Sequence, residues 1–167
     1  MTRTRSRLAS ALGCTIVVLV VATASPANAG RPAPEPWRLP VDGTVVEEFR
    51  APAHAYGPGH RGVDIAPASG NAVRAAAAGT IAFAGTVVDR GVVTIDHGGG
   101  WVTSVEPVEP SVGVGEVVVA GDVIGTIGLG GHAEAGTVHV GVRRDGEYVN
   151  PLTLVGRVPR AILLPCC

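Results

Sequence analysis

Short β-forming segments separated by glycine dominate the chain from residue 41 to residue 155. Valine, isoleucine and threonine recur there in runs such as TVVEEF, GVVTIDH, GEVVVAGDVIG and TVHVGVRR. Apolar and polar residues alternate in VVTIDH and VHVGVRR, which is the pattern of strands with one buried face. Gly98-Gly99-Gly100 and Asp145-Gly146 supply turn residues between such runs. We therefore predict an all-β fold with a compact, mostly antiparallel β-sheet core, built as a half-open barrel or a sandwich.

The first 29 residues have the composition of an export signal. Three arginines precede an apolar run over 8–24, and Ala27-Asn28-Ala29 offers a small-x-small cleavage pattern. The apolar run is slightly short of the roughly 20 residues that span a bilayer, which favours a cleaved signal over a membrane anchor. We predict a secreted or cell-wall-associated protein that keeps no stable membrane span after signal cleavage.

The remainder of the chain divides into three parts. Residues 30–44 read as a proline-rich linker, residues 45–155 as the β-domain and residues 156–167 as a C-terminal tail. The tail ends in Cys166-Cys167, and neighbouring cysteines rarely form a disulfide with each other. We therefore expect the domain to be held by its core, and by a metal if one binds, rather than by an internal disulfide.

Composition excludes two classes of function. Without residues 1–29, ten arginines stand against 14 acidic residues, a net charge of −4, so there is no basic footprint for nucleic acid. The stretch VVVAGDVIGTIG resembles the hammerhead half of biotinyl and lipoyl carrier domains. Such a carrier needs an acceptor lysine, and the chain contains none.

Histidine and aspartate are the candidate metal ligands. The five histidines are His54, His60, His97, His132 and His139. Catalytic zinc sites take three protein ligands, from imidazole nitrogen or carboxylate oxygen, and leave one position for water. His60 and Asp64 in HRGVDI, with His139 on a later strand, would supply such a set. The HxxxD pattern alone is weakly specific, because it also fits a loop histidine followed by a solvated carboxylate.

Four segments occur in one order along residues 45–154. They are HRGVDIAPASGNAVRAAAAGTIAFAG, GVVTIDHGGGWVTSVEPV, VGEVVVAGDVIGTIG and TVHVGVRRDGEYVNPLTL. Together they closely resemble the lysostaphin/LytM-type zinc metallopeptidase family, whose members cut peptide cross-bridges of bacterial peptidoglycan. The resemblance implies a small antiparallel β-core and a Zn²⁺ ion held by His60, Asp64 and His139.

The chain departs from this family at two positions. The family has a second, non-ligand histidine two residues before the last ligand, where this chain has Thr137. It also has a histidine that faces the zinc-bound water in a T-x-Y-x-H-L segment, where this chain has Pro107. General acid–base help from such groups is typically worth ~10²- to 10⁴-fold in rate, so their loss predicts a weak or inactive enzyme.

Substitutes for the missing histidines are available in the sequence. His132, on the glycine-rich stretch GGHAEAG, is the candidate substitute base, and Glu106 and Glu134 are further candidates. Each of the three also fits a solvated surface residue. Of the remaining residues, we interpret His97 as structural and His54 as a loop histidine. Arg61 would line a cleft or pair with an acid, and Trp101 and Tyr148 would either stack on substrate or lie partly buried in the sheet.

Two functions are compatible with these residues. The first is a secreted zinc metalloendopeptidase-like domain, directed at peptidoglycan peptide cross-links, with weak or absent catalysis. The second is a non-catalytic cell-wall binding or regulatory protein that modulates a partner peptidoglycan hydrolase. Both predict peptidoglycan or its stem and cross-bridge peptides as a ligand.

Overall fold

The computed structural model of the chain describes residues 37–54, 56–131 and 136–156. The expected signal segment, the first part of the linker, most of the tail, His132 and Glu134 lie outside the described residues. Within the described part, no helix is long and apolar enough to cross a membrane.

Strands account for nearly all the regular structure of the described residues, which confirms the all-β prediction. They are β1 (Gly43–Glu47), β2 (Val63–Pro67), β3 (Ala72–Arg74), β4 (Gly79–Val87), β5 (Arg90–Gly98), β6 (Trp101–Glu106), β7 (Val108–Pro110), β8 (Val117–Val118), β9 (Val123–Ile127), β10 (Val138–Arg144) and β11 (Glu147–Val149). One turn of 3₁₀ helix, η1 (Pro151–Thr153), follows the last strand.

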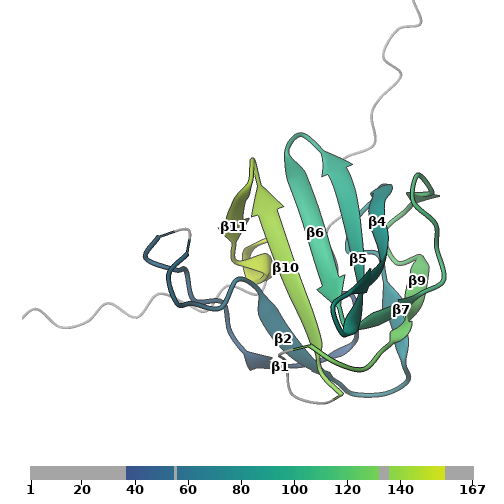
Figure 1. Cartoon of the computed structure of the whole chain (residues 1–167), viewed down its shortest axis with the longest axis horizontal. Helices are drawn as coiled ribbons and strands as arrows, with labels where there is room; N and C mark the ends of the chain where they lie inside the picture. The colour runs from purple at the N-terminus through teal and green to yellow at the C-terminus, as the bar shows by residue number, and fades with distance from the viewer. Residues whose placement is uncertain (1–36, 55, 132–135, 157–167) are drawn as a thin grey trace, which may run out of the picture. The chain divides into compact units, whose positions relative to one another are not determined.

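The strands form two antiparallel sheets (Figure 1). The large sheet has the order β1-β2-β10-β6-β5-β4-β8, with β11 paired to the end of β10. The small sheet has the order β3-β9-β7. The large sheet ends at β1 on one side and at β8 on the other, so the described strands do not close into a barrel.

Side-chain alternation divides the large sheet into a core face and an open face. The valines of β10 are buried in the core together with Val93 and Ile95 of β5 and Val105 of β6. Strand registers place the neighbouring residues on the opposite side, which we call the open face. Its residues are Thr94 and Asp96 on β5, Val102, Ser104 and Glu106 on β6, and His139, Gly141 and Arg143 on β10.

Turn residues and core contacts define the edges of the domain. Asp145 and Gly146 join β10 to β11 with φ values of 52° and 89°, as a two-residue hairpin loop of this composition requires. At the N-terminal side, Val41 is buried in the core and β1 begins at Gly43. The folded part therefore includes residues that the sequence assigned to the linker 30–44.

Candidate metal centre

His60, Asp64 and His139 come together at one end of the large sheet. Asp64 is the second residue of β2 and His139 the second residue of β10, and the antiparallel register places them directly opposite each other. His60 precedes β2 and is held by an isolated β-bridge to Arg50. All three side chains are buried. The strand register thus joins residues that are 75 positions apart in the sequence.

The donor atoms of these three side chains converge. His60 Nε2 lies 3.1 Å from Asp64 Oδ1 and 3.2 Å from His139 Nδ1, and His139 Nδ1 lies 2.7 Å from Asp64 Oδ1. Their donor atoms all lie within 4.8 Å of one another, and no other His, Cys, Asp or Glu of the described residues belongs to such a group. Buried polar atoms that point at each other in this way need a shared proton or a shared cation.

A backbone carbonyl orients the His60 ring. His60 Nδ1 lies 2.9 Å from the Glu48 oxygen, so its Nδ1–H donates to that carbonyl. The neutral ring then has its lone pair on Nε2, the nitrogen that faces Asp64 and His139. A metal-binding histidine characteristically donates its other N–H group in this way.

The three donors fit a zinc ion. Tetrahedral zinc with bonds of about 2.0–2.2 Å to nitrogen and oxygen separates neighbouring ligand atoms by roughly 3.3–3.6 Å. The observed separations of 2.7 to 3.2 Å are somewhat shorter, so a small outward movement of the side chains would accommodate the ion. Two neutral imidazoles and one carboxylate are a donor set that zinc accepts, with one position left for another ligand.

Gly62, between the first two ligand candidates, is part of the site that the sequence reasoning missed. A Cβ at this position would lie 2.3 Å from the Val140 carbonyl oxygen and 2.6 Å from His139 Nε2. The His139 ring therefore packs against the backbone at Gly62, where any side chain would displace it. A signal was present in the sequence, because this glycine lies at the centre of HRGVDI.

Thr137 and Pro107, which the resemblance aligns with two histidines, carry no group able to transfer protons near neutral pH. Thr137 is buried just before β10, and Pro107 follows Glu106 at the end of β6. A threonine hydroxyl is too weak a base, and a proline ring has no titratable atom. These two sites therefore offer no general base or acid.

Glu106 lies on the open face directly opposite His139. Its carboxylate is not one of the converging donors, and its Oε2 lies 2.9 Å from Arg90 Nε. The Nε–H group is not aligned with a hydrogen-bond acceptor, so we describe the contact as an ion pair. The Glu106 carboxylate raises the pKa of the Arg90 guanidinium. Arg90 thus pairs with Glu106, the one acidic side chain of β6, which neighbours His60, Asp64 and His139 (the trio).

His97 lies at the other end of the sheet, away from these ligands. Its Nδ1 donates to the Ala78 carbonyl and its Nε2 accepts from the Thr103 hydroxyl, both at 2.8 Å. The ring packs against Trp37, with centroids 4.7 Å apart. Burial lowers the pKa of His97, which keeps the ring neutral. Both nitrogens are engaged, so His97 has a structural role.

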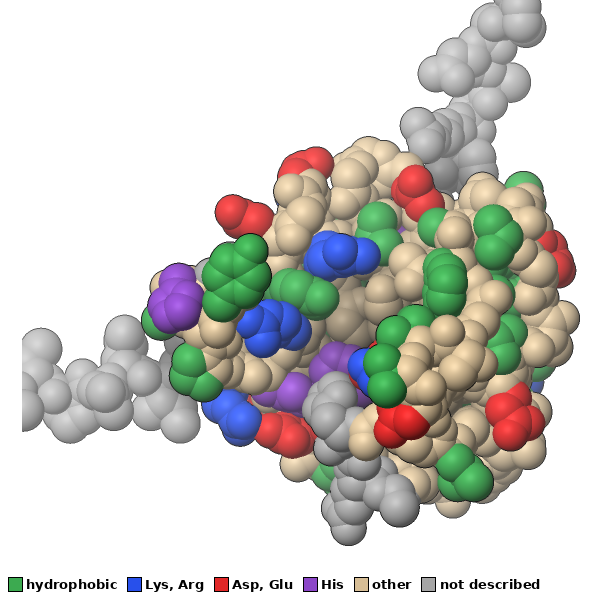
Figure 2. Space-filling view, in the orientation of Figure 1, with side chains coloured by type: hydrophobic (Ala, Val, Ile, Leu, Met, Phe, Trp, Pro, Cys, Tyr) green, Lys and Arg blue, Asp and Glu red, His purple; other side chains and the backbone are tan. Residues whose placement is uncertain are grey.

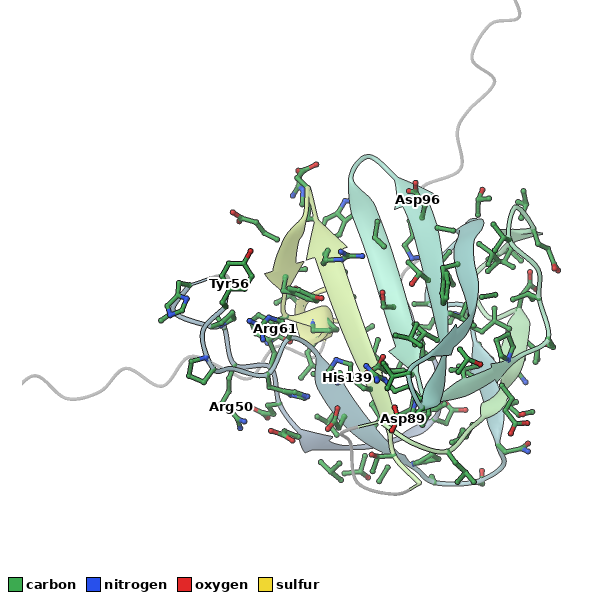
Figure 3. All side chains as sticks on the ribbon, in the orientation of Figure 1. Arg50, Tyr56, Arg61, Asp89, Asp96 and His139 are labelled. Atoms are coloured by element: carbon green, nitrogen blue, oxygen red, sulfur yellow. The ribbon has the colours of Figure 1, made fainter. Side chains whose placement is uncertain are left out.

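The other sequence candidates are spread around the site. His54 is exposed on the loop that also carries Tyr56, and Arg61 donates from Nη2 to the Gly57 carbonyl, 3.1 Å away. Arg61 lies in the segment that leads into β2, and Figure 3 shows it near His139. Trp101 is covered by Trp37 and by Arg144, whereas Tyr148 is 40% exposed.

Comparisons with known proteins identify the family of the chain and agree with its fold. The model of peptidase family M23 matches residues 58–151. An uncharacterized protein of Mycobacterium tuberculosis is 40% identical over 129 residues, covering 74% of this chain and 52% of that protein. The murein hydrolase activator NlpD of Salmonella dublin is 33% identical over 120 residues, covering 70% of this chain and 30% of that protein. The chain thus spans about half or less of these curated relatives.

A solved structure shows the same fold. The catalytic domain of the antimicrobial peptidase lysostaphin from Staphylococcus simulans superimposes with a TM-score of 0.58. The match covers 68% of this chain and 92% of that one, at 22% sequence identity. The β-architecture is therefore shared although most side chains differ.

Proposed function

Because this chain belongs to peptidase family M23, we propose that it is an exported zinc-binding domain directed at the peptide cross-links of peptidoglycan, with little or no catalytic turnover. The family model matches more than half of the chain and includes all three ligand candidates.

The observation that carries this proposal is the convergence of His60, Asp64 and His139. Three buried donors of the types that zinc prefers face one point, and the His60 tautomer leaves the correct nitrogen available. Zinc bound there would polarise a peptide carbonyl and lower the pKa of a bound water molecule. The chain itself contributes the ligand geometry and the packing of the His139 ring on Gly62.

Low turnover follows from the residues around the trio. Thr137 and Pro107 cannot transfer a proton, and the absence of general acid–base help typically costs ~10² to 10⁴ in rate. Glu106 neighbours His139 but is held by Arg90. His132, our candidate substitute base from the sequence, lies outside the described residues and remains a candidate.

A second function has its own support. NlpD is named a murein hydrolase activator, and a third of the aligned positions are identical in this chain. A domain that binds cell-wall peptide and activates a partner hydrolase would need the binding face of the fold but no proton-transfer groups. Export through the signal segment 1–29 is part of both proposals, because peptidoglycan lies outside the cytoplasmic membrane.

Zinc stoichiometry and a muropeptide digest test the two proposals together. We expect about one zinc per purified chain, lost in His139→Ala, and little or no new muropeptide from purified peptidoglycan. A zinc-free wild-type protein would contradict the metal centre. Rapid digestion by the wild type that His139→Ala abolishes would contradict the low turnover. If His132→Ala also abolished that digestion, His132 would be identified as the substitute base. If the chain made an added cell-wall hydrolase digest peptidoglycan faster, the second function, activation of a partner hydrolase, would be favoured.

A further inference from the structure

Arg143 presents a positive charge on the open face, along β10 from His139. Its guanidinium carbon lies 5.8 Å from the centre of the Tyr148 ring, which holds it by a cation–π contact. Tyr148 is directly opposite Arg143 in the β10–β11 register. An arginine that rests on an aromatic ring keeps its N–H groups pointing outward for a planar acceptor.

The acidic side chains of the open face are engaged elsewhere. Glu106 is paired with Arg90, and Asp96 accepts a hydrogen bond from the Gly98 backbone N–H. Among the residues that the structure describes, no carboxylate forms an ion pair with Arg143. Its charge therefore has no acidic partner within the described part of the chain.

Only small residues lie between the metal centre and Arg143 on the open face of β10 and β6. Gly141 lies between His139 and Arg143 on the same face of β10. A Cβ at Gly141 would meet the Arg61 carbonyl oxygen at 3.3 Å, Tyr148 at 3.5 Å and His139 Nε2 at 3.7 Å. A larger side chain at Gly141 would therefore press on the Arg61 backbone, Tyr148 and His139, and the residue paired with Gly141 on β6 is the small Ser104. In Figure 2, blue arginine side chains border a hollow at whose base the purple histidines lie.

The spacing suits an extended peptide. His139 and Arg143 are four residues apart on one strand, which corresponds to about 13 Å at roughly 3.3 Å per residue. A peptide with one carbonyl group at the trio can therefore reach Arg143 with a group several residues along its chain. The acceptor that a guanidinium binds best is a carboxylate, through two parallel N–H···O bonds.

We propose that Arg143, supported by Tyr148, binds a free carboxylate of the peptide whose backbone lies at the His60, Asp64 and His139 centre. The inference rests on the proposed function and adds a substrate class to it: peptides that carry a free carboxylate several residues from the carbonyl at the metal centre. Arg143 would then determine specificity without taking part in the reaction.

Equilibrium binding to two matched probes tests the proposal. The first probe is soluble stem peptide prepared from peptidoglycan, and the second is the same peptide with its carboxylates converted to carboxamides. Binding is measured by calorimetry with the zinc-loaded full chain. The variant is Arg143→Gln, and the matched control is Arg144→Gln, because the guanidinium of Arg144 lies over Trp101, 5.0 Å from its ring centre.

We expect the wild-type chain to bind the carboxylate probe at least about tenfold more tightly than the carboxamide probe. Arg143→Gln should abolish this difference in affinity and still bind zinc. Arg143→Lys should retain part of the difference, and Arg144→Gln should leave it unchanged. Equal affinity of the wild type for both probes would overturn the carboxylate subsite alone. If Arg143→Gln lost affinity equally for both probes, the carboxylate subsite would also be overturned, because Arg143 would then have a structural role. Failure of the wild type to bind either probe would contradict the proposed function as well.

Discussion

The two ends of the large sheet place histidine in opposite environments. At one end, His60 and His139 point their donor nitrogens at each other and at Asp64, within 3.2 Å. At the other end, His97 has a separate hydrogen-bond partner for each ring nitrogen and a tryptophan against its ring. The first arrangement needs a cation or proton to be stable, whereas the second is complete by itself.

The two ends also differ in the residue types that adopt a positive φ. Val88, in the β4–β5 hairpin at the metal end, has φ of 60° although it is β-branched and 93% exposed. Non-glycine residues with such angles are uncommon and concentrate at functional sites. At the other end, the β5–β6 turn uses glycines at its positive φ values, and the β10–β11 turn uses Asp145 and Gly146, residue types that adopt such angles more readily than valine. The one β-branched residue with a positive φ among the described residues therefore lies at the end of the sheet that carries His60, Asp64 and His139.

The largest expected difference between the two ends is in zinc affinity. Asp64→Ala removes the only charged donor of the trio and should weaken zinc binding at least about 100-fold, since a site with two ligands does not hold the ion. His97→Ala should bind zinc as the wild type does. Competition with a chromogenic chelator measures both, and equal zinc loss in the two variants would remove the distinction between the ends.

The next effect concerns the packing of His139. Gly62→Ala places a Cβ 2.3 Å from the Val140 carbonyl oxygen, so the backbone or the His139 ring must move. We expect a loss of about 3 kcal/mol in the free energy of unfolding, together with weaker zinc binding. Gly141→Ala is the matched control, because its shortest contact would be 3.3 Å, and it should cost less than about 1 kcal/mol. Urea denaturation measures both, and similar losses would contradict the role of Gly62.

The structural role of His97 predicts a smaller change. His97→Leu removes the hydrogen bonds to Ala78 and Thr103 and should lower the free energy of unfolding by about 1–3 kcal/mol with zinc binding unchanged. An unchanged urea midpoint would show that these bonds contribute nothing.

The same variant predicts a change in pH dependence. Burial lowers the pKa of His97 below its ordinary value of 6.5, so the unfolded chain binds a proton that the folded protein does not. This contribution to stability is complete above that value and is lost as the pH falls through the window below it. His97→Leu should therefore lose less stability than the wild type on acidification from about pH 7.5 to about pH 5. If the free energy of unfolding fell by the same amount with pH in both proteins, His97 would not be the source of this pH dependence.

The smallest effect tests the strained hairpin. Val88→Gly relieves the positive φ and should raise the free energy of unfolding by about 1 kcal/mol. Val87→Gly, in the regular strand β4, should instead lower it by about 0.5–1 kcal/mol. A loss of stability in both variants would show that the Val88 backbone is not strained.

Local pattern was sufficient to predict the all-β class and the hairpin turn at Asp145-Gly146, whereas the choice of His60, Asp64 and His139 as zinc ligands depended on the resemblance to a family. Alternation with period two and turn chemistry depend on neighbouring residues, so a sequence displays them directly. The two positions without histidine, Thr137 and Pro107, were also visible by resemblance. These inferences concern residue types at given spacings along the chain.

Tertiary structure alone decided which side chains meet. The register between β2 and β10 places His139 opposite Asp64, and the register between β10 and β6 places Glu106 opposite His139. The roles of Gly62 and Arg143 follow from contacts between strands. A shift of one residue would turn each of these side chains to the other face of the sheet, and only the packing of the whole core excludes that shift.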